Sequence, residues 1–330
     1  MKIDIHSHVF DRGFFDAMMR DMRLSPQTSA SGQTLLRKDG YTYMWWREGF
    51  FDMDQRVALM DRQGIAMRGL SLSSPSVYDW PAERQPELAR YINDATERIV
   101  AAHPGRFFGI GTLPLGDIEA TLSELDRLVE RPGMHGVMIG SNVGGLQLNH
   151  ARFEPVWARI DALRMPVFEH PMFPPNMGQE EFELPLRLGF VFDTTTCVTL
   201  LIYSGVFERY PNFPYVMAHT GGALLVLLER LDNGYRLFED CRRFINRLPS
   251  EYARQLYYDT ASFHGPTLML AHGMVGADHL LFGSDEPLIG ADTRLIEGLA
   301  ISEADKATIL GGNAARVFGL PVPSGSPVPA

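Results

Sequence analysis

Two histidines near the start of the chain, His6 and His8, have the spacing of a metal-ligand pair. They end an apolar run, Ile3 to His8, that predicts a buried β-strand. Because successive side chains on a strand point to opposite faces, the two imidazoles point the same way and can bind one cation together. An isolated His-x-His pair also occurs as simple packing, so its meaning depends on the rest of the chain.

Other residues with metal-binding or acid-base chemistry end later apolar runs. His170 precedes a proline, His219 precedes Thr-Gly-Gly, and Asp285 ends a Gly-Ser-Asp sequence. The chain has ten histidines, and four of them fall at such run ends. Imidazoles and a carboxylate are donors that Zn²⁺ binds well, and imidazole exchanges protons near neutral pH.

The elements that must position these residues alternate between short β-type runs and stretches of helical period. The predicted strands are 3–8, 68–73, 107–113, 136–141, 166–170, 215–219, 256–261 and 280–285, and helical stretches include 86–102, 118–130, 153–163, 224–241 and 302–318. Eight βα units predict an α/β fold, a (β/α)8 TIM barrel, whose active site lies at the carboxyl ends of the strands. A doubly wound open sheet is disfavoured because no Gly-x-Gly-x-x-Gly follows any predicted strand.

The length of 330 residues suits one barrel domain, which we expect over residues 1–320. The extra length lies mainly between the first two strands, at about 10–51, and predicts an insertion that covers the barrel mouth. Residues 321–330 are rich in Pro, Ser and Gly, which predicts a disordered tail.

The charge and composition point to small-molecule chemistry. A net charge of -10 and a pI near 5.5 argue against nucleic acid, whose binding needs clustered Lys and Arg. No stretch approaches ~20 uninterrupted apolar residues, so no membrane partner is expected. With two cysteines and no secretion-signal pattern at the start, we expect a cytoplasmic protein.

Taken in order, the His-x-His pair, His170-Pro, His219-x-Gly-Gly and Gly-Ser-Asp285 resemble the amidohydrolase superfamily (amidohydrolase-related family 2). The resemblance is to the branch of aminocarboxymuconate-semialdehyde decarboxylase and related metal-dependent aromatic-acid decarboxylases. It covers nearly the whole chain, from His6 to the segment that begins at Gly312.

The resemblance implies a site built around one divalent metal, usually Zn²⁺, with Mn²⁺, Co²⁺ or Fe²⁺ as alternatives. The implied metal ligands are His6, His8, His170 and Asp285. His219 would stay off the metal as an acid-base residue, and His219 and Asp285 would be the catalytic pair. A second metal is not expected, because the fourth predicted strand offers neither Lys nor Glu. In the alternative, purely structural roles, Asp285 caps a helix and His219 makes a helix-terminal hydrogen bond.

The insertion contains an aromatic stretch, 41–52, with a single arginine, Arg47. Arg47 matches an arginine that binds the substrate carboxylate in the resembling decarboxylases, and a guanidinium binds a carboxylate through two hydrogen bonds. Alternatively the stretch is a hydrophobic lid in which Arg47 pairs with Glu48 or Asp52. Expected aromatic contacts for a flat acid are Trp46, Phe173 and Phe192, with Met172 and Phe190 nearby.

Arg230 lies eleven residues after His219, about two turns into a predicted helix. At that distance it sits roughly 10 Å below the barrel mouth, too far for its own site. The resemblance implies that the matching arginine reaches a neighbouring copy, so a homodimer, or a tetramer, is expected. The alternative is a surface pair with Glu229 or Asp232.

These observations favour a non-oxidative decarboxylase that releases CO₂ from a conjugated or aromatic carboxylic acid. Two routes fit the same residues: addition of metal-bound hydroxide to the unsaturated system, or direct chelation of the acid with protonation of the ring carbon. The alternative function is a metal-dependent hydrolase or hydratase of a lactone, ester, amide or unsaturated acid, because the fold alone does not choose the reaction. A non-catalytic binding protein is disfavoured because every expected ligand and His219 are present.

Overall fold

Eight parallel strands form the centre of the protein in the computed structural model, which describes residues 1–38, 41–173, 181–290 and 292–321. The strands are β1 (Ile3–His8), β5 (Met67–Ser71), β6 (Phe107–Thr112), β7 (Met134–Gly140), β10 (Val167–His170), β11 (Tyr215–Met217), β12 (Tyr257–Asp259) and β13 (Leu280–Leu281). They pair in this order, each parallel to its neighbour. Parallel strands are buried on both faces, which explains their apolar sequences.

The first strand and the last strand meet and close the barrel. The Ile5 amide donates to the Phe282 carbonyl at 2.9 Å, and the His8 amide donates to the Glu286 carbonyl at 2.7 Å. The predicted (β/α)8 TIM barrel is therefore confirmed. Because the barrel closes, residues from near both ends of the sequence lie together at the mouth of the barrel.

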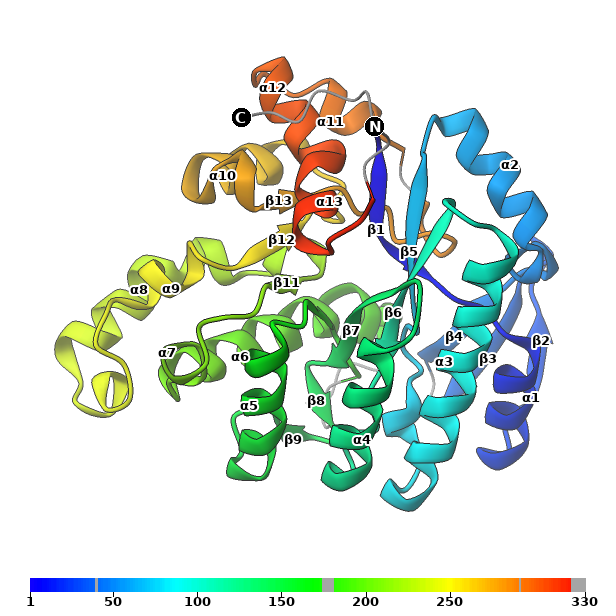
Figure 1. Ribbon diagram of the computed structural model, residues 1–330, viewed down its shortest axis with the longest axis horizontal. Coiled ribbons are helices and arrows are strands. Elements are labelled where there is room, and N and C mark those ends of the chain that lie inside the picture. The colour runs from blue at the N-terminus through cyan, green and yellow to red at the C-terminus, as the bar shows by residue number, and fades with distance from the viewer. Residues whose placement is uncertain (39–40, 174–180, 291, 322–330) are drawn as a thin grey trace.

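Helices connect the strands and surround the barrel (Figure 1). The longer ones are α2 (Met53–Gln63), α3 (Gln85–Ala102), α4 (Ile118–Val129), α5 (Glu154–Leu163), α6 (Phe190–Tyr203), α8 (Leu224–Leu237) and α10 (Gly265–Val275). Shorter ones are α7 (Val206–Arg209), α9 (Pro249–Ala253), α11 (Arg294–Glu297), α12 (Glu303–Ala307) and α13 (Asn313–Val317). In α4, Thr121, Leu125 and Leu128 are buried at helical spacing, so one face packs on the barrel.

A buried ionic network lies beneath the site, at the seam between β1, β5 and the segment after β13. Asp4 shares the inward face of β1 with the two histidines, and Arg68 Nε lies 3.1 Å from its Oδ2. Arg68 Nη1 also lies 3.4 Å from Glu286 Oε2, which Arg56 contacts at 2.5 Å. The Ser284 amide and hydroxyl donate to Asp4 at 3.0 and 2.6 Å. Each buried charge thus has an opposite partner, as burial requires.

The segment between β1 and β5 forms a small antiparallel sheet and a helix. Its elements are α1 (Arg12–Asp21), β2 (Pro26–Thr28), β3 (Thr34–Lys38), β4 (Tyr41–Trp46) and a 3-10 turn, η1 (Glu48–Phe51). The Asp11 carboxylate caps α1 by accepting from the Phe14 amide at 2.9 Å. The Phe10 ring stacks on Phe15 at 5.1 Å, so the insertion packs through aromatic contacts of its own. A short hairpin, β8 (Asn142–Val143) and β9 (Leu146–Gln147), follows β7.

One helical stretch among the described residues, Glu181–Tyr203, is long and apolar enough to cross a membrane. Half of its most apolar window is buried inside the protein, however. Thr194 and Val198 of α6 are fully buried, and the Thr194 hydroxyl donates to Glu169 of β10 at 3.1 Å. The apolar composition of this stretch is therefore that of a helix packed on the barrel.

The predicted elements differ from the observed ones mainly at their ends. The eighth predicted strand runs to Asp285, whereas β13 ends at Leu281 because the chain then bends over the mouth, with a positive φ of 54° at Asp285. The predicted helix 302–318 is interrupted by a π-helical turn, Thr308–Gly312, where a Cβ at Gly311 would lie 2.3 Å from the Met1 carbonyl oxygen. The predicted tail lies outside the described residues except for Pro321.

Candidate metal centre and substrate cavity

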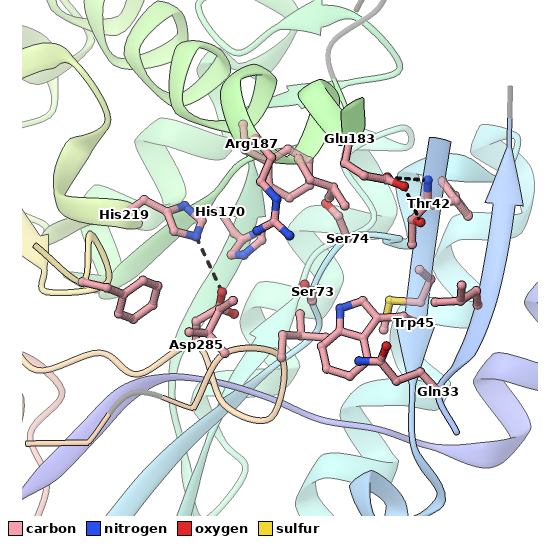
Figure 2. Close-up of a pocket in the computed structure, with 18 residues that line it drawn as sticks. Gln33, Thr42, Trp45, Ser73, Ser74, His170, Glu183, Arg187, His219 and Asp285 are labelled. Atoms are coloured by element: carbon pink, nitrogen blue, oxygen red, sulfur yellow. Dashed lines mark hydrogen bonds and ion pairs between the residues drawn. The ribbon is translucent and has the colours of Figure 1, made fainter. Parts of the chain in front are cut away.

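Four imidazoles and one carboxylate meet at the carboxyl ends of the strands. The ring centroids of His6, His8 and His170 lie 5.0, 5.1 and 5.3 Å from one another, and the His219 ring lies 5.2 Å from His6. Asp285 Oδ1 is 3.1 Å from His8 Nε2, and Asp285 Oδ2 is 4.0 Å from His219 Nε2 (Figure 2). The five residues singled out in the sequence are therefore brought together, although nearly the whole chain separates them.

Two overlapping sets of these residues have donor atoms close enough to share a cation. One is His6, His8 and His170, and the other is His6, His219 and Asp285, with donor atoms within 4.8 Å of one another. His6 Nε2 is buried and has no hydrogen-bond partner among the described residues. Because a buried polar atom without a partner costs free energy, this nitrogen is suited to receive a metal ion. The donors fit a divalent cation of the zinc type.

Hydrogen bonds behind the site orient the imidazoles. The far nitrogen of His6, Nδ1, lies 2.5 Å from Asp259 Oδ2, while the Thr220 and Ala261 amides donate to Asp259 Oδ1 at 2.9 Å each. A proton on Nδ1 leaves the Nε2 lone pair directed at the centre, as in metal-bound histidines that donate to a carboxylate. His170 Nδ1 likewise lies 3.0 Å from the Pro171 carbonyl oxygen, which fixes the same tautomer.

The electrostatics keep most of these imidazoles neutral and the aspartate charged. Burial lowers the pKa of His8 and His219, and it holds the pKa of His170 well below its usual value. Burial alone would raise the pKa of Asp285, but the hydrogen bond with His8 and the neighbouring His6 and His219 together outweigh burial, so the pKa is lowered. Burial lowers the pKa of His6 too, but the Asp259 hydrogen bond and the nearby carboxylates of Asp259, Asp285 and Asp4 together outweigh burial, so the pKa is raised. Neutral imidazoles have the free lone pairs that a cation needs.

The His-Thr-Gly-Gly sequence makes a sharp turn after β11. From His219 to Gly222 the φ angles are 53°, 55°, 72° and 63°, all in the left-handed region. A Cβ at Gly222 would lie 2.3 Å from the Val191 carbonyl oxygen of α6, so only glycine fits there. Positive φ in residues other than glycine is uncommon and is often found at functional sites. Here the turn directs the His219 ring to the centre.

A cavity of about 460 Å³ opens from this centre, a volume that suits a small organic ligand. Figure 2 shows His219, His170 and Asp285 on one side of it and Trp45 and Gln33 on the other. Its apolar lining comprises Leu35, Tyr43, Met44, Trp45, Leu186, Phe190, Phe263, Leu288 and Ile289. Its other lining residues include Gln33, Thr42, Ser73, Ser74, Glu183 and Arg187. The centre thus lies at one end of a chamber with aromatic walls.

The aromatic residues expected from the sequence lie around this chamber but mostly not on its surface. Trp45 lines the cavity, whereas Trp46 is buried, with its ring 5.4 Å from Phe15. Phe173 lies behind the wall, 5.0 Å from the Phe190 ring, which does line the cavity. Phe192 is 45% exposed on α6 and is not among the lining residues that the structure describes.

Neither of the two arginines expected from the sequence lines the cavity of this copy. Arg47 is exposed and lines an adjacent cavity of about 510 Å³, which shares only Ile289 with the first. Its alternative partners are otherwise engaged, since Glu48 pairs with Arg12 and Asp52 accepts from the Gln55 amide at 3.0 Å.

Arg230 is exposed on α8, as its position in the helix predicted. Its alternative partners are also engaged: Glu229 pairs with Arg236 at 2.8 Å, and Asp232 accepts from the Ser250 amide at 2.9 Å. Both surface-pair alternatives therefore fail for Arg230.

The sequence analysis missed several residues of the site. Asp259 had a signal, because it lies near the carboxyl end of the predicted strand 256–261. For Trp45 the sequence contains no signal that distinguishes it from Trp46, since the strand register decides which ring faces the cavity. Arg187 and Phe263 lie in irregular segments with no informative spacing.

A comparison with known protein families agrees with the barrel fold and with the geometry of the site. The family model described as Amidohydrolase matches residues 3–320. This chain belongs to the amidohydrolase family. The match includes every strand of the barrel and all five residues of the centre, so the resemblance inferred from the motifs is confirmed.

Curated relatives of this amidohydrolase carry decarboxylase names. The 2-amino-3-carboxymuconate-6-semialdehyde decarboxylase of Dictyostelium discoideum is 28% identical over 335 residues, which cover 97% of this chain and 92% of the relative. The gamma-resorcylate decarboxylase of Polaromonas sp. (strain JS666) is 31% identical over 284 residues, which cover 81% and 87%. Both alignments span most of each partner.

A solved structure gives the same picture. The dihydroxybenzoic acid decarboxylase from Polaromonas sp. JS666 was solved with bound manganese and the inhibitor 2-nitroresorcinol. It superposes with a TM-score of 0.79 at 27% identity and covers 97% of this amidohydrolase and 97% of its own chain. The whole architecture is therefore shared with a metal-bound decarboxylase.

Proposed function

We propose that this amidohydrolase is a metal-dependent, non-oxidative decarboxylase that releases CO₂ from a conjugated or aromatic carboxylic acid. The observation that supports this most is the combination of the His and Asp centre with a cavity of about 460 Å³ whose walls carry Tyr43, Trp45 and Phe190. Such walls suit the flat face of an unsaturated acid. The decarboxylase names of the relatives point the same way.

We propose that His6, His8, His170 and Asp285 hold one divalent cation. Three neutral nitrogens and one carboxylate oxygen suit Zn²⁺, which we infer as the resident metal, and Mn²⁺, Co²⁺ and Fe²⁺ fit the same donors. A second metal lacks a ligand at the carboxyl end of β7, where a Cβ at Gly140 would lie 2.5 Å from Met172 Cγ. When bound, the metal supplies a positive centre that attracts an acid and withdraws electron density from it.

His219 is the group we propose to deliver the proton. Its Nδ1 is buried without a hydrogen-bond partner among the described residues, and its Nε2 faces the Asp285 carboxylate. In decarboxylation the bond to the carboxylate carbon breaks, its electron pair stays on the substrate carbon, and a proton must replace CO₂ there. We propose that His219 donates that proton and that Asp285 stabilises the imidazolium that precedes the transfer.

The cavity walls hold the acid in the orientation that this transfer needs. Trp45 and Phe190 form the surface, and we propose that the predicted residues Trp46, Phe173 and Phe192 act as its supports or its margin. Phe173 packs against both Tyr43 and Phe190, at 5.3 and 5.0 Å between ring centroids. Arg47 lines the adjacent cavity, on the other side of Ile289. We propose that it contacts the substrate carboxylate once the segment at Ile289 moves aside.

A homodimer that shares residues between sites is the proposed assembly. Val226, Arg230 and Leu237 lie on one stripe of α8, and the two apolar side chains are 68% and 72% exposed. Phe238 and Phe244, just beyond, are 61% and 52% exposed. Figure 1 shows this part of the chain projecting from the barrel. Exposed apolar side chains of this kind favour a contact with a second copy, which Arg230 would enter.

We also propose a cytoplasmic location, because Cys197 and Cys241 are both free thiols and Cys197 is buried.

A direct test is CO₂ release from a panel of hydroxylated benzoates, pyridine carboxylates and muconate-type acids, by protein loaded with Zn²⁺ or Mn²⁺. We expect release from at least one acid, and a loss of about 10²- to 10⁴-fold in kcat for His219→Gln with its metal content unchanged. His264→Gln is the matched control, because His264 follows β12 and its ring bonds to Thr267, outside the proposed metal centre. Turnover of lactones or esters without CO₂ release would instead support the hydrolase.

A further inference from the structure

A second positively charged group, in addition to the proposed metal, lies in the cavity. Arg187 belongs to the π-helical turn Pro185–Gly189 that leads into α6, and it lines the same cavity as His170 and Asp285. Figure 2 shows its guanidinium directed into the chamber, in front of His170. Among the described residues that line the cavity, it is the only Arg or Lys.

The neighbouring acid does not neutralise this arginine. Glu183 stands four residues before Arg187, a spacing at which Glu and Arg pair on a regular helix. Here Glu183 has a φ of 58°, which breaks the helix, and its carboxylate turns to the insertion. It accepts from the Thr42 amide at 2.7 Å and from the Thr42 hydroxyl at 2.9 Å. Within the described ranges no carboxylate contacts Arg187, so its charge is available to a ligand.

The positive charges of the cavity therefore favour a ligand that carries more than one negative charge. With three neutral imidazoles and one carboxylate, a divalent metal keeps a net charge of about +1. Arg187 adds a second positive charge at a different wall of the same chamber. An acid with one carboxylate can neutralise only one of these two centres, and complementary charge decides which ligands are preferred.

We propose that Arg187 determines substrate specificity by binding a second carboxylate of the substrate, so that the preferred substrate is a planar dicarboxylic acid. This inference rests on the proposed decarboxylation, in which the first carboxylate is lost near His219. The second carboxylate stays on the product, because it is held at Arg187 away from the proton donor. A guanidinium can grip that carboxylate through two parallel hydrogen bonds, which also fixes the orientation of the ring.

The experiment compares matched pairs of probes. Each pair is a 2-hydroxybenzoate with a second ring carboxylate and the same compound as the monomethyl ester at that second carboxylate. The dissociation constant from calorimetry and kcat/KM for CO₂ release are measured for the wild type, Arg187→Leu and Arg187→Lys. Arg159→Leu is the control for the same chemical change, because Arg159 lies on α5 and pairs with Asp126 at the surface.

We expect the wild type to prefer the diacid over its ester, and Arg187→Leu to reduce that preference about tenfold. Arg187→Lys should retain part of the preference, Arg159→Leu all of it, and metal content should be the same in all variants. A wild type that binds no diacid, or an unchanged preference in Arg187→Leu, overturns the inference. If no acid releases CO₂ but diacid binding still depends on Arg187, the proposed function fails and the role of Arg187 stands.

Discussion

The two sides of the cavity are built in different ways. On the metal side, His6, His8 and His170 are at most 2% exposed and sit on strands whose positions the barrel ladder fixes. On the side formed by the insertion and by the turn before α6, Trp45 is half-buried and Arg187 is exposed. The difference teaches that the strand ends hold their side chains more rigidly than the insertion and the turn do, and substrate selection is proposed for the less rigid side, as is common for loops on a rigid scaffold.

The two sides also differ in how they manage charge. Beneath the metal side, Asp4, Arg68 and Glu286 are fully or almost fully buried and pair with one another. On the opposite side, the charge of Arg187 has no internal partner among the described residues. The paired charges are buried in the fold, whereas Arg187 is exposed to solvent at the cavity and is open to contact with a ligand.

The largest effect is expected on the metal side. His8→Ala removes one of the nitrogens proposed to hold the cation and leaves Asp285 without its 3.1 Å contact. We expect loss of bound metal, measured by elemental analysis of the purified protein, and a fall in kcat/KM of about 10³-fold or more. His264→Ala should keep both. Full metal content in His8→Ala would contradict the assigned ligand set.

The buried network beneath the centre should matter for stability. Arg68→Met leaves Asp4 and Glu286 short of positive charge in the interior, and we expect about 3–5 kcal/mol of lost stability in urea unfolding. The control Arg159→Met breaks a surface pair and should cost less than about 1 kcal/mol. Equal losses in the two variants would remove the distinction between the two kinds of charge.

A smaller effect is expected from loosening the opposite side. Glu183→Ala removes the acceptor that ties the turn before α6 to Thr42, so Arg187 loses its fixed position. We expect KM for the preferred acid to rise about tenfold while metal content and kcat change little. Thr42→Ser keeps the hydroxyl donor and should behave like the wild type. A large loss of metal in Glu183→Ala would show that the two sides are not separable.

The smallest effect is expected on the pH dependence of stability, and it comes from a histidine at the amino ends of the strands, away from the cavity. His279 precedes β13, its Nδ1 lies 2.9 Å from the Leu256 carbonyl oxygen, and burial lowers its pKa. The unfolded chain therefore takes up this proton first as the pH falls below 6.5, the ordinary value, so stability declines from there toward the folded pKa. His279→Gln should make that decline shallower in unfolding measured from pH 7 to pH 5. An identical decline would exclude His279 as a contributor.

The sequence was informative where local rules apply. Strand periodicity and run ends placed His6, His8, His170, His219 and Asp285, because a barrel brings the carboxyl ends of its strands to one face. It was less informative where packing decides. Trp45 and Trp46 are adjacent and chemically alike, and only the register of β4 against β3 determines that Trp45 lines the cavity. Likewise, Glu183 contacts Thr42, which lies 141 residues away, rather than Arg187, and nothing in the local spacing predicts this.

The sequence by itself determined the barrel and the five residues that meet at its mouth, because alternation, helical period and residue type are local properties that survive without coordinates. Only the tertiary structure decided which side chains surround the ligand and which charges stay unpaired. Those properties depend on contacts between segments far apart in the chain, and such contacts leave no periodic trace in the sequence.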